Sequence, residues 1–211
     1  MSGRASRAPP HVGATPAGAY HGRMDPTELR RRVDDLAAEP DRMRRRLVAL
    51  GALTARLAPQ GIEPVLVGGF ALAVYTNGGY TTADVDLALP MTPEVDAAFA
   101  DLGFEKLGRF WTRKDLDLYF EAPAPAGLPG ETAPRTVLDL DGLEVLVLGV
   151  EDLLIDRSRA WVHRKSDEDG RWAARLAALY GERMDWAYLR ERVSAEPTEV
   201  DALAHLEEGS R

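Results

Sequence analysis

The sequence predicts an α/β (α+β) fold, in which a mixed β-sheet core follows N-terminal helices and precedes a helical tail. First, residues 65–89 resemble a buried strand, a glycine turn, a short helix, a second turn and another strand. Second, residues 135–148 are two apolar segments around Asp141-Gly142, a dipeptide typical of hairpins. Third, apolar residues recur at helical spacing before residue 58 and after residue 150, which places helices at both ends.

Composition excludes several classes of protein. The chain has 211 residues, 45% hydrophobic and 28% charged, which is ordinary for one globular domain with a small appendage. A net charge of −8 argues against adhesion to nucleic acid through the overall field of the protein. The absence of cysteine excludes disulfides and thiolate metal sites. No apolar run approaches the roughly 20 residues that span a bilayer, so we expect no membrane partner, and the absence of cysteine fits a cytoplasmic protein.

The N-terminal third divides into an arm and two helices. Residues 1–23 are rich in Gly, Ala, Pro and Arg and are predicted to be a disordered arm. Asp25-Pro26 is typical of a helix start, so we expect helices over 26–38 and 41–57. The arginines of residues 42–46 are either a solvated helix face or a contact to a polyanionic acceptor such as RNA.

The remaining elements follow from turn signals and periodicity. A helix is expected over 95–102, then strands over 104–112 and 116–120 joined by a turn at 113–115, and a Pro/Gly-rich loop over 123–134. Four tail helices are predicted over 151–162, 171–180, 185–193 and 199–207. The expected regions are the arm, a core with its N-terminal helices (24–150) and a helical region (151–211).

Two acids in the second strand carry the chemistry. Because side chains alternate along a strand, Asp84 and Asp86 point to one side while Val85 and Leu87 point into the core. Two adjacent carboxylates repel each other, and a divalent cation relieves that repulsion. Hard oxygen ligands suit Mg²⁺, which binds through one or two carboxylates plus substrate phosphates.

The turn before the helix is suited to an anion. Gly68 and Gly69 allow a backbone to approach a phosphate closely, and the amides at the start of the next helix favour negative charge. Thr81 and Thr82 either bind a phosphate, orient Asp84 or cap the turn. The sequence therefore predicts a site for a nucleoside triphosphate with its metal.

A third acid is expected on the strand that follows. Metal-assisted phosphoryl transfer commonly uses another carboxylate to bind the metal or deprotonate the attacking hydroxyl. Alternation over residues 115–121 places Asp117 and Glu121 on the same side of that strand, away from Leu118 and Phe120. The pattern alone does not choose between Asp117 and Glu121.

These motifs occur in an order that resembles the nucleotidyltransferase superfamily, which has the polymerase-beta-like fold. The closer similarity is to small stand-alone bacterial and archaeal nucleotidyltransferases, some of which belong to toxin–antitoxin or abortive-infection modules. The resemblance spans roughly residues 52–193. It comprises Gly68-Gly69, Thr82, Asp84-x-Asp86, Leu102-Gly103-Phe104 with Gly108-Arg109, Phe120-Glu121-Ala122-Pro123, Leu148-Gly149-Val150-Glu151-Asp152 and Asp156-Arg157.

The resemblance implies a Mg²⁺- or Mn²⁺-dependent enzyme that transfers NMP from an NTP such as ATP to an acceptor hydroxyl and releases pyrophosphate. It favours Glu121 over Asp117, because an acid in similar sequences lies just before a strand-ending proline. It thereby implies a metal site of Asp84, Asp86 and Glu121. The acceptor is RNA, protein or a small molecule.

The resemblance also suggests nucleotide contacts. The residues expected at the nucleotide are Gly68, Gly69, Thr81, Thr82 and Arg109. Similar sequences often carry an arginine where this chain has Tyr80.

Two alternative functions stay open from the sequence. One is the toxin component of a toxin–antitoxin module, with an antitoxin partner bound through the tail or arm. The other is a catalytically silent nucleotide-binding protein of the same fold.

Overall fold

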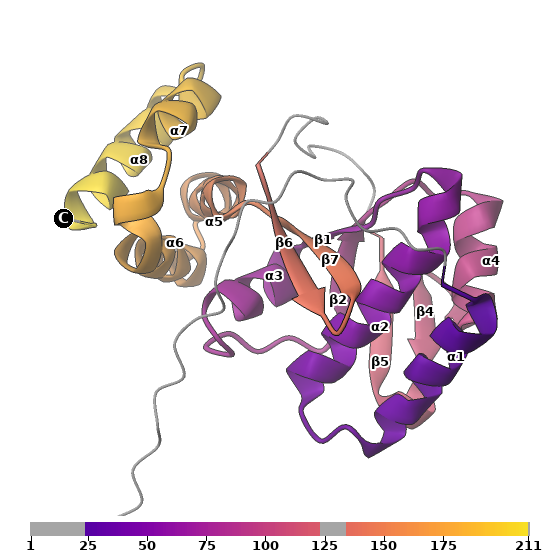
Figure 1. Cartoon of the computed structure of the whole chain (residues 1–211). Helices are drawn as coiled ribbons and strands as arrows, with labels where there is room; N and C mark the ends of the chain where they lie inside the picture. The colour runs from indigo at the N-terminus through magenta and orange to yellow at the C-terminus, as the bar shows by residue number, and fades with distance from the viewer. Residues whose placement is uncertain (1–23, 123–133, 211) are drawn as a thin grey trace, which may run out of the picture.

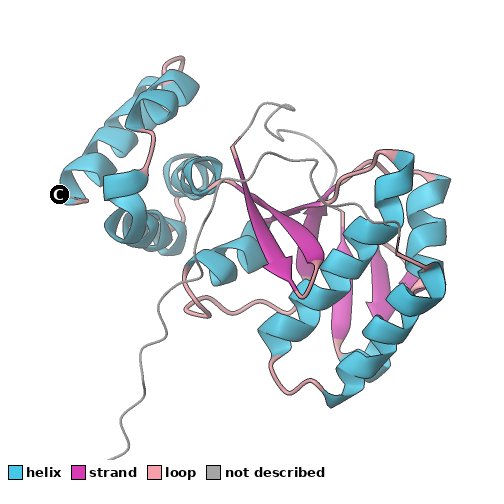
Figure 2. Ribbon diagram, viewed as in Figure 1, coloured by secondary structure: helices cyan, strands magenta, loops and turns pink. Residues whose placement is uncertain are grey.

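A single seven-stranded mixed sheet forms the centre of the protein, in the order β3-β4-β5-β2-β1-β7-β6 (Figures 1 and 2). The computed structural model describes residues 24–122 and 134–210, so the expected arm and residues 123–133 of the expected loop lie outside the described residues. The strands are β1 (Val65–Val67), β2 (Val85–Ala88), β3 (Glu105–Leu107), β4 (Phe110–Arg113), β5 (Leu118–Glu121), β6 (Arg135–Leu140) and β7 (Leu143–Leu148). The predicted fold class is confirmed.

The pairing of the central strands decides which residues share a face. Strand β1 runs antiparallel to β2 and parallel to β7, and β2 runs parallel to β5. Leu66 lies opposite Leu87 and Val147 in this register. These buried side chains therefore point to one face, and Asp86, one residue out of step with Leu87, points to the other.

The apolar face is covered by helices from the N-terminal part of the chain. Figure 1 shows α1 and α2 side by side over the sheet, and α2 also contacts α4. At Gly51 the helix approaches β7 so closely that an added Cβ would lie 2.8 Å from the Cβ of Leu143. The first four helices are α1 (Pro26–Asp34), α2 (Arg42–Leu57), α3 (Gly68–Tyr75) and α4 (Pro93–Asp101).

The expected tail is helical and packs on the core through aromatic side chains. Its helices are α5 (Val150–Arg164), α6 (Asp167–Tyr180), α7 (Trp186–Val193) and α8 (Pro197–Gly209). The rings of Tyr75 and Tyr180 meet edge to face at 5.5 Å, and those of Tyr80 and Trp172 do so at 5.3 Å. Among the described residues, no helix has both the length and the apolar character to cross a membrane.

Two predicted segments differ from the structure. The expected strand over 104–112 is two strands, β3 and β4, because Gly108 adopts a left-handed conformation (φ +60°) and reverses the chain. Where a simple hairpin turn at 113–115 was expected, a 3-10 turn, η3 (Lys114–Leu116), leads to Asp117, which is also left-handed (φ +54°). Strand β5 therefore begins only at Leu118. In contrast, the hairpin around Asp141-Gly142 is confirmed.

Candidate active site

The sheet register gathers three carboxylates on the face opposite α2. Asp86 on β2 lies beside Glu121 on β5, and Asp84 lies directly before β2. Carboxylate oxygens of Asp84, Asp86 and Glu121 all lie within 4.8 Å of one another. We call these three residues the acid cluster.

The acid cluster concentrates negative charge in a half-buried place. Burial, and then the charges of Asp84 and Glu121, raise the pKa of Asp86 to about 6. A hydrogen bond from the Gly69 amide and the charge of Arg157 oppose that rise in pKa only in part. Among the described residues, an ion pair within 4.0 Å links the cluster to one cation, Arg109, whose nitrogen lies 3.2 Å from Glu121. Arg109 is 70% exposed, so solvent screens this pair.

The two glycines make room for the side chains around them. Gly68 is left-handed (φ +64°), and a Cβ there would overlap the carboxylate of Asp86. At Gly69 a Cβ would lie 2.9 Å from the ring of Tyr80. The diglycine thus lets the start of α3 approach the acid cluster, and its predicted contact with phosphate stays a prediction.

The threonines before β2 occupy different environments. The Thr82 hydroxyl donates a 2.6 Å hydrogen bond to Asp84 Oδ1, so Thr82 orients this carboxylate. Thr81 is exposed.

The structure separates the two candidates for the third acid. Glu121 is buried at the end of β5, within the acid cluster. Asp117 lies before the start of β5, and its carboxylate pairs with Arg42 instead. Since Asp117 precedes the strand in a left-handed conformation, the strand alternation that was expected to align it with Glu121 does not apply.

The arginines of residues 42–46, here called the arginine cluster, mostly contact other groups of the protein itself. Arg44 pairs with Glu39 and Asp141, and Arg45 donates to backbone carbonyls. Arg46 is buried, at 7% exposed, and its guanidinium donates to the carbonyls immediately before Asp84. Sequence reasoning did not single out Arg46 as a site residue. Its position one helical turn before the buried Leu50 was a usable signal.

Two other polar residues lie on α5. Arg157 pairs with Asp156 and, at 2.8 Å, with Asp169, while its charge also reaches Asp86. His163 lies 2.8 Å from the buried Glu199 on α8, a contact that ties these two helices together.

The donor set of the acid cluster fits a hard divalent cation. Three carboxylates can supply oxygen ligands, which Mg²⁺ and Mn²⁺ accept. Burial is the largest cause of the raised pKa of Asp86, and the charges of Asp84 and Glu121 add to it, so the acids repel one another when all are ionised. A cation among them would relieve that repulsion.

Comparisons with known proteins bear on the fold. No protein-family profile matches the sequence, and no curated protein matches it. An antigenic nucleotidyltransferase-like protein from Paracoccidioides brasiliensis has a similar structure, with a TM-score of 0.52, 18% identity, and coverage of 78% of this chain and 93% of that chain.

Two structures of the antibiotic-resistance factor ANT(2'')-Ia are more distant. Its solution structure has a TM-score of 0.45 at 17% identity, covering 88% of this chain and 99% of that chain. Its crystal structure with adenylyl-2''-tobramycin has a TM-score of 0.37 at 18% identity, covering 74% and 93%. At 18% identity the similarity to the Paracoccidioides protein shows the fold alone, so the chain shares the fold of that nucleotidyltransferase-like protein.

Proposed function

We propose that this protein is a Mg²⁺- or Mn²⁺-dependent nucleotidyltransferase, which transfers NMP from an NTP to an acceptor hydroxyl. The acid cluster carries the proposal: three carboxylates, two on adjacent strands and one directly before β2, lie within 4.8 Å of one another beside a glycine turn. A purely structural cluster of acids would be expected to have cations paired with each member. Here the one paired cation among the described residues is the exposed Arg109.

Each residue of the site has a proposed role. Asp84 and Asp86 hold the metal, and Glu121 completes the site or accepts the proton of the acceptor hydroxyl. A bound divalent cation neutralises the charge that develops on the phosphoryl oxygens. The acceptor oxygen bonds to the α-phosphorus as the bond to the β-phosphate oxygen breaks, and pyrophosphate leaves.

The chain's own groups would orient the triphosphate. Backbone amides at the start of α3, near Gly68 and Gly69, are proposed to bind the phosphates. Arg109 is exposed beside Glu121 and is proposed to contact the triphosphate. Thr82 keeps Asp84 oriented throughout. Positioning of this kind supplies much of the rate in phosphoryl transfer.

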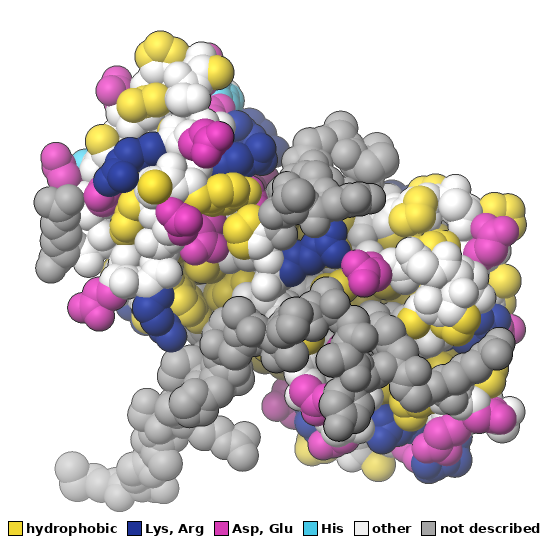
Figure 3. All heavy atoms as spheres, turned by 45° about the horizontal axis from the view of Figure 1, so that its top comes forward, with side chains coloured by type: hydrophobic (Ala, Val, Ile, Leu, Met, Phe, Trp, Pro, Cys, Tyr) yellow, Lys and Arg dark blue, Asp and Glu magenta, His cyan; other side chains and the backbone are white. Residues whose placement is uncertain are grey.

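The surface favours a small molecule or a protein over RNA as the acceptor. On the face in Figure 3, acidic and basic side chains alternate over the described residues and form no broad basic patch. The net charge is −8, and arginines 42–46 contact groups of the protein itself. An RNA acceptor would be expected to meet a continuous basic surface.

The test is transfer of label from α-³²P-labelled NTPs. The full-length protein is incubated with each NTP, Mg²⁺ or Mn²⁺, and acceptors that include tRNA, protein and aminoglycosides. We expect metal-dependent labelling of one acceptor class, which Asp84→Asn abolishes and Asp117→Asn retains. No labelling in any mixture, together with unaltered Mn²⁺ binding in Asp84→Asn, would contradict the proposal.

Two alternatives from the resemblance have their own readouts. A silent nucleotide-binding protein would bind ATP with Mg²⁺ in calorimetry and transfer nothing. A toxin would arrest growth when expressed, and a cognate antitoxin would relieve the arrest.

A further inference from the structure

Arg46 lies beneath the acid cluster rather than within it. Its side chain rises from α2, which covers the opposite face of the sheet, and it is 7% exposed. The guanidinium donates one hydrogen bond of 2.8 Å to the carbonyl of Thr82 and one of 3.0 Å to the carbonyl of Ala83. It also lies over the ring of Phe70, 5.4 Å from the ring centre.

These contacts join the two segments that build the site. Thr82 and Ala83 directly precede Asp84, and Phe70 directly follows Gly69. One side chain therefore holds both the turn that enters β2 and the start of α3. The Thr82 hydroxyl extends the chain of contacts to the carboxylate of Asp84 at 2.6 Å.

The turn before Asp84 is supported by a buried guanidinium, that of Arg46. Removing this group from water is unfavourable, and carbonyl partners offset less of that desolvation than carboxylates do. The planar fork of an arginine can bind two adjacent carbonyls at once with fixed geometry, which an apolar side chain cannot do. At this place the guanidinium fixes the backbone directly before Asp84, and its positive charge lies near that carboxylate.

We propose that Arg46 is a positioning residue that sets the spacing of Asp84 relative to Asp86 and Gly68, and thereby sets the affinity of the acid cluster for its metal. This inference rests on the proposed function, because it assigns Arg46 to the same metal site. The residue touches neither substrate nor metal; it acts through Thr82 and Ala83.

The neighbouring Arg45 offers a matched control. It lies on the same helix, is partly buried, and likewise donates to two backbone carbonyls, those of Glu39 and Leu116 (3.0 Å for Leu116). Glu39 lies between α1 and α2, and Leu116 lies five residues before Glu121, whereas Thr82 and Ala83 directly precede Asp84. Loss of Arg45 should therefore cost stability in a similar way and leave the metal site unchanged.

The experiment measures Mn²⁺ affinity of the full-length protein without nucleotide, by electron paramagnetic resonance and calorimetry. We expect Arg46→Met to weaken Mn²⁺ binding by about 10- to 100-fold, the range seen when outer-shell supports of metal ligands are removed. Arg46→Lys should lose less affinity, since an ammonium can still reach one carbonyl. Arg45→Met should bind Mn²⁺ like the wild type even if its melting temperature falls.

Chemical rescue separates a positioning role from general stability. Added guanidinium ion at low millimolar concentration should restore part of the Mn²⁺ affinity of Arg46→Ala and none to Arg45→Ala. If Arg46→Met does not fold, then Arg46→Lys and the rescue of Arg46→Ala decide the outcome.

The results distinguish two kinds of failure. The role of Arg46 would be wrong if folded Arg46→Met bound Mn²⁺ like the wild type, or if Arg45→Met lost as much Mn²⁺ affinity as Arg46→Met. In either case Asp86→Asn would still abolish Mn²⁺ binding. If instead Asp86→Asn bound Mn²⁺ as well as the wild type, the metal site itself would be wrong.

Discussion

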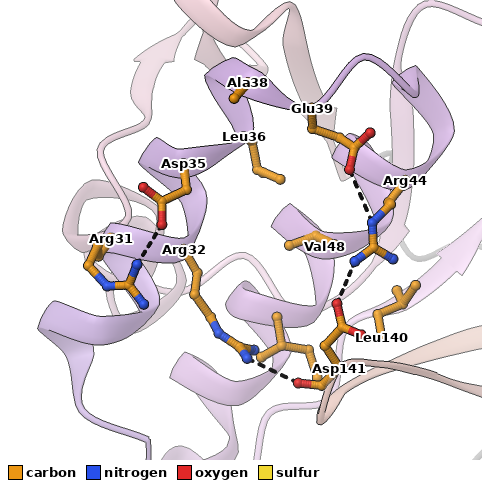
Figure 4. Close-up of a pocket in the computed structure, with 11 residues that line it drawn as sticks. Arg31, Arg32, Asp35, Leu36, Ala38, Glu39, Arg44, Val48, Leu140 and Asp141 are labelled. Atoms are coloured by element: carbon orange, nitrogen blue, oxygen red, sulfur yellow. Dashed lines mark hydrogen bonds and ion pairs between the residues drawn. The ribbon is translucent and has the colours of Figure 1, made fainter.

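Two charged regions of this protein differ in how their charges are balanced. A pocket on the helix-covered side is lined by Arg31, Arg32, Arg44, Asp35, Glu39 and Asp141, over apolar residues such as Leu36 and Val48 (Figure 4). We call it the arginine-lined pocket. Arg31 meets Asp35 at 2.6 Å, and Arg44 meets both Glu39 at 3.1 Å and Asp141. Arg32 donates to the Asp141 carbonyl at 3.1 Å.

The acid cluster lies on the face of the sheet opposite α2, and its negative charges exceed the positive charges paired with them. Its three carboxylates have one exposed arginine as an ion-pair partner among the described residues, and the pKa of Asp86 is raised. The comparison teaches that the number of charges does not identify a site. Charges that pair with one another stabilise the fold, whereas like charges held together by the backbone mark a candidate functional site.

The largest expected effect comes from one acid of the cluster. Asp86→Asn keeps the shape of the side chain and removes a metal ligand, so we expect kcat/KM to fall by about 100-fold or more. Stability without metal should hold or rise, because repulsion within the cluster is relieved. Nucleotide transfer and thermal unfolding are measured together.

Asp141→Asn is the matched control in the arginine-lined pocket. Asn-Gly suits the same hairpin turn as Asp141-Gly142, so the variant removes only a charge. Transfer should be unaffected. A loss of activity equal to that of Asp86→Asn would erase the distinction between the two regions.

The second expected effect concerns the glycine turn. Gly68→Ala and Gly61→Ala both place a side chain at positive φ, +64° and +68°, where strain costs about 1–2 kcal/mol. The space around Gly61 is open, whereas a Cβ at Gly68 would force Asp86 to move. We expect only Gly68→Ala to weaken Mn²⁺ binding, by at least roughly 10-fold. Equal Mn²⁺ affinities in the two variants would show that Asp86 can move without cost.

The third expectation concerns pH. The pKa of Asp86 rises from 3.8 to about 6 on folding, so the folded state holds the extra proton between those values. In metal-free buffer this residue's contribution to stability therefore decreases as pH rises from about 4 to 6, and the loss is complete above that range. The melting temperature of Asp86→Asn minus that of the wild type should increase over this window and then level off.

Metal binding should show the opposite trend with pH. Protons compete with the metal for Asp86, so Mn²⁺ affinity should fall by up to about tenfold per unit as pH drops below 6. An affinity that is constant between pH 5 and 7 would contradict the raised pKa.

The smallest expected effects are at exposed pairs. Asp117→Asn removes the pair with Arg42, and Arg44→Gln removes pairs in the arginine-lined pocket. The partners Arg42 and Asp141 are exposed and Glu39 is partly exposed, so each change should cost less than about 1 kcal/mol. Urea unfolding measures the cost, and transfer should be unchanged. A large loss of nucleotide transfer in Asp117→Asn would show that Asp117, which the structure places outside the acid cluster, takes part in the reaction.

Local patterns were sufficient to predict several parts of the molecule. The period of two in residues 84–89 placed Asp84 and Asp86 on one face, and Asp141-Gly142 located a hairpin. Side-chain alternation and turn preference depend on neighbours in the chain, so they are readable from the sequence alone. The same holds for the helices on either side of the core.

Tertiary structure decided what lies beside the acid pair. Glu121 rather than Asp117 joins it, because parallel pairing of β2 with β5 aligns Glu121 with Asp86 and the 3-10 turn ends before β5 begins. Arg46 is buried beneath Asp84 while Arg42 in the same cluster faces solvent, since only the packing of α2 against the sheet distinguishes them. Strand register and helix packing join residues far apart in the chain, and no local pattern encodes those distances.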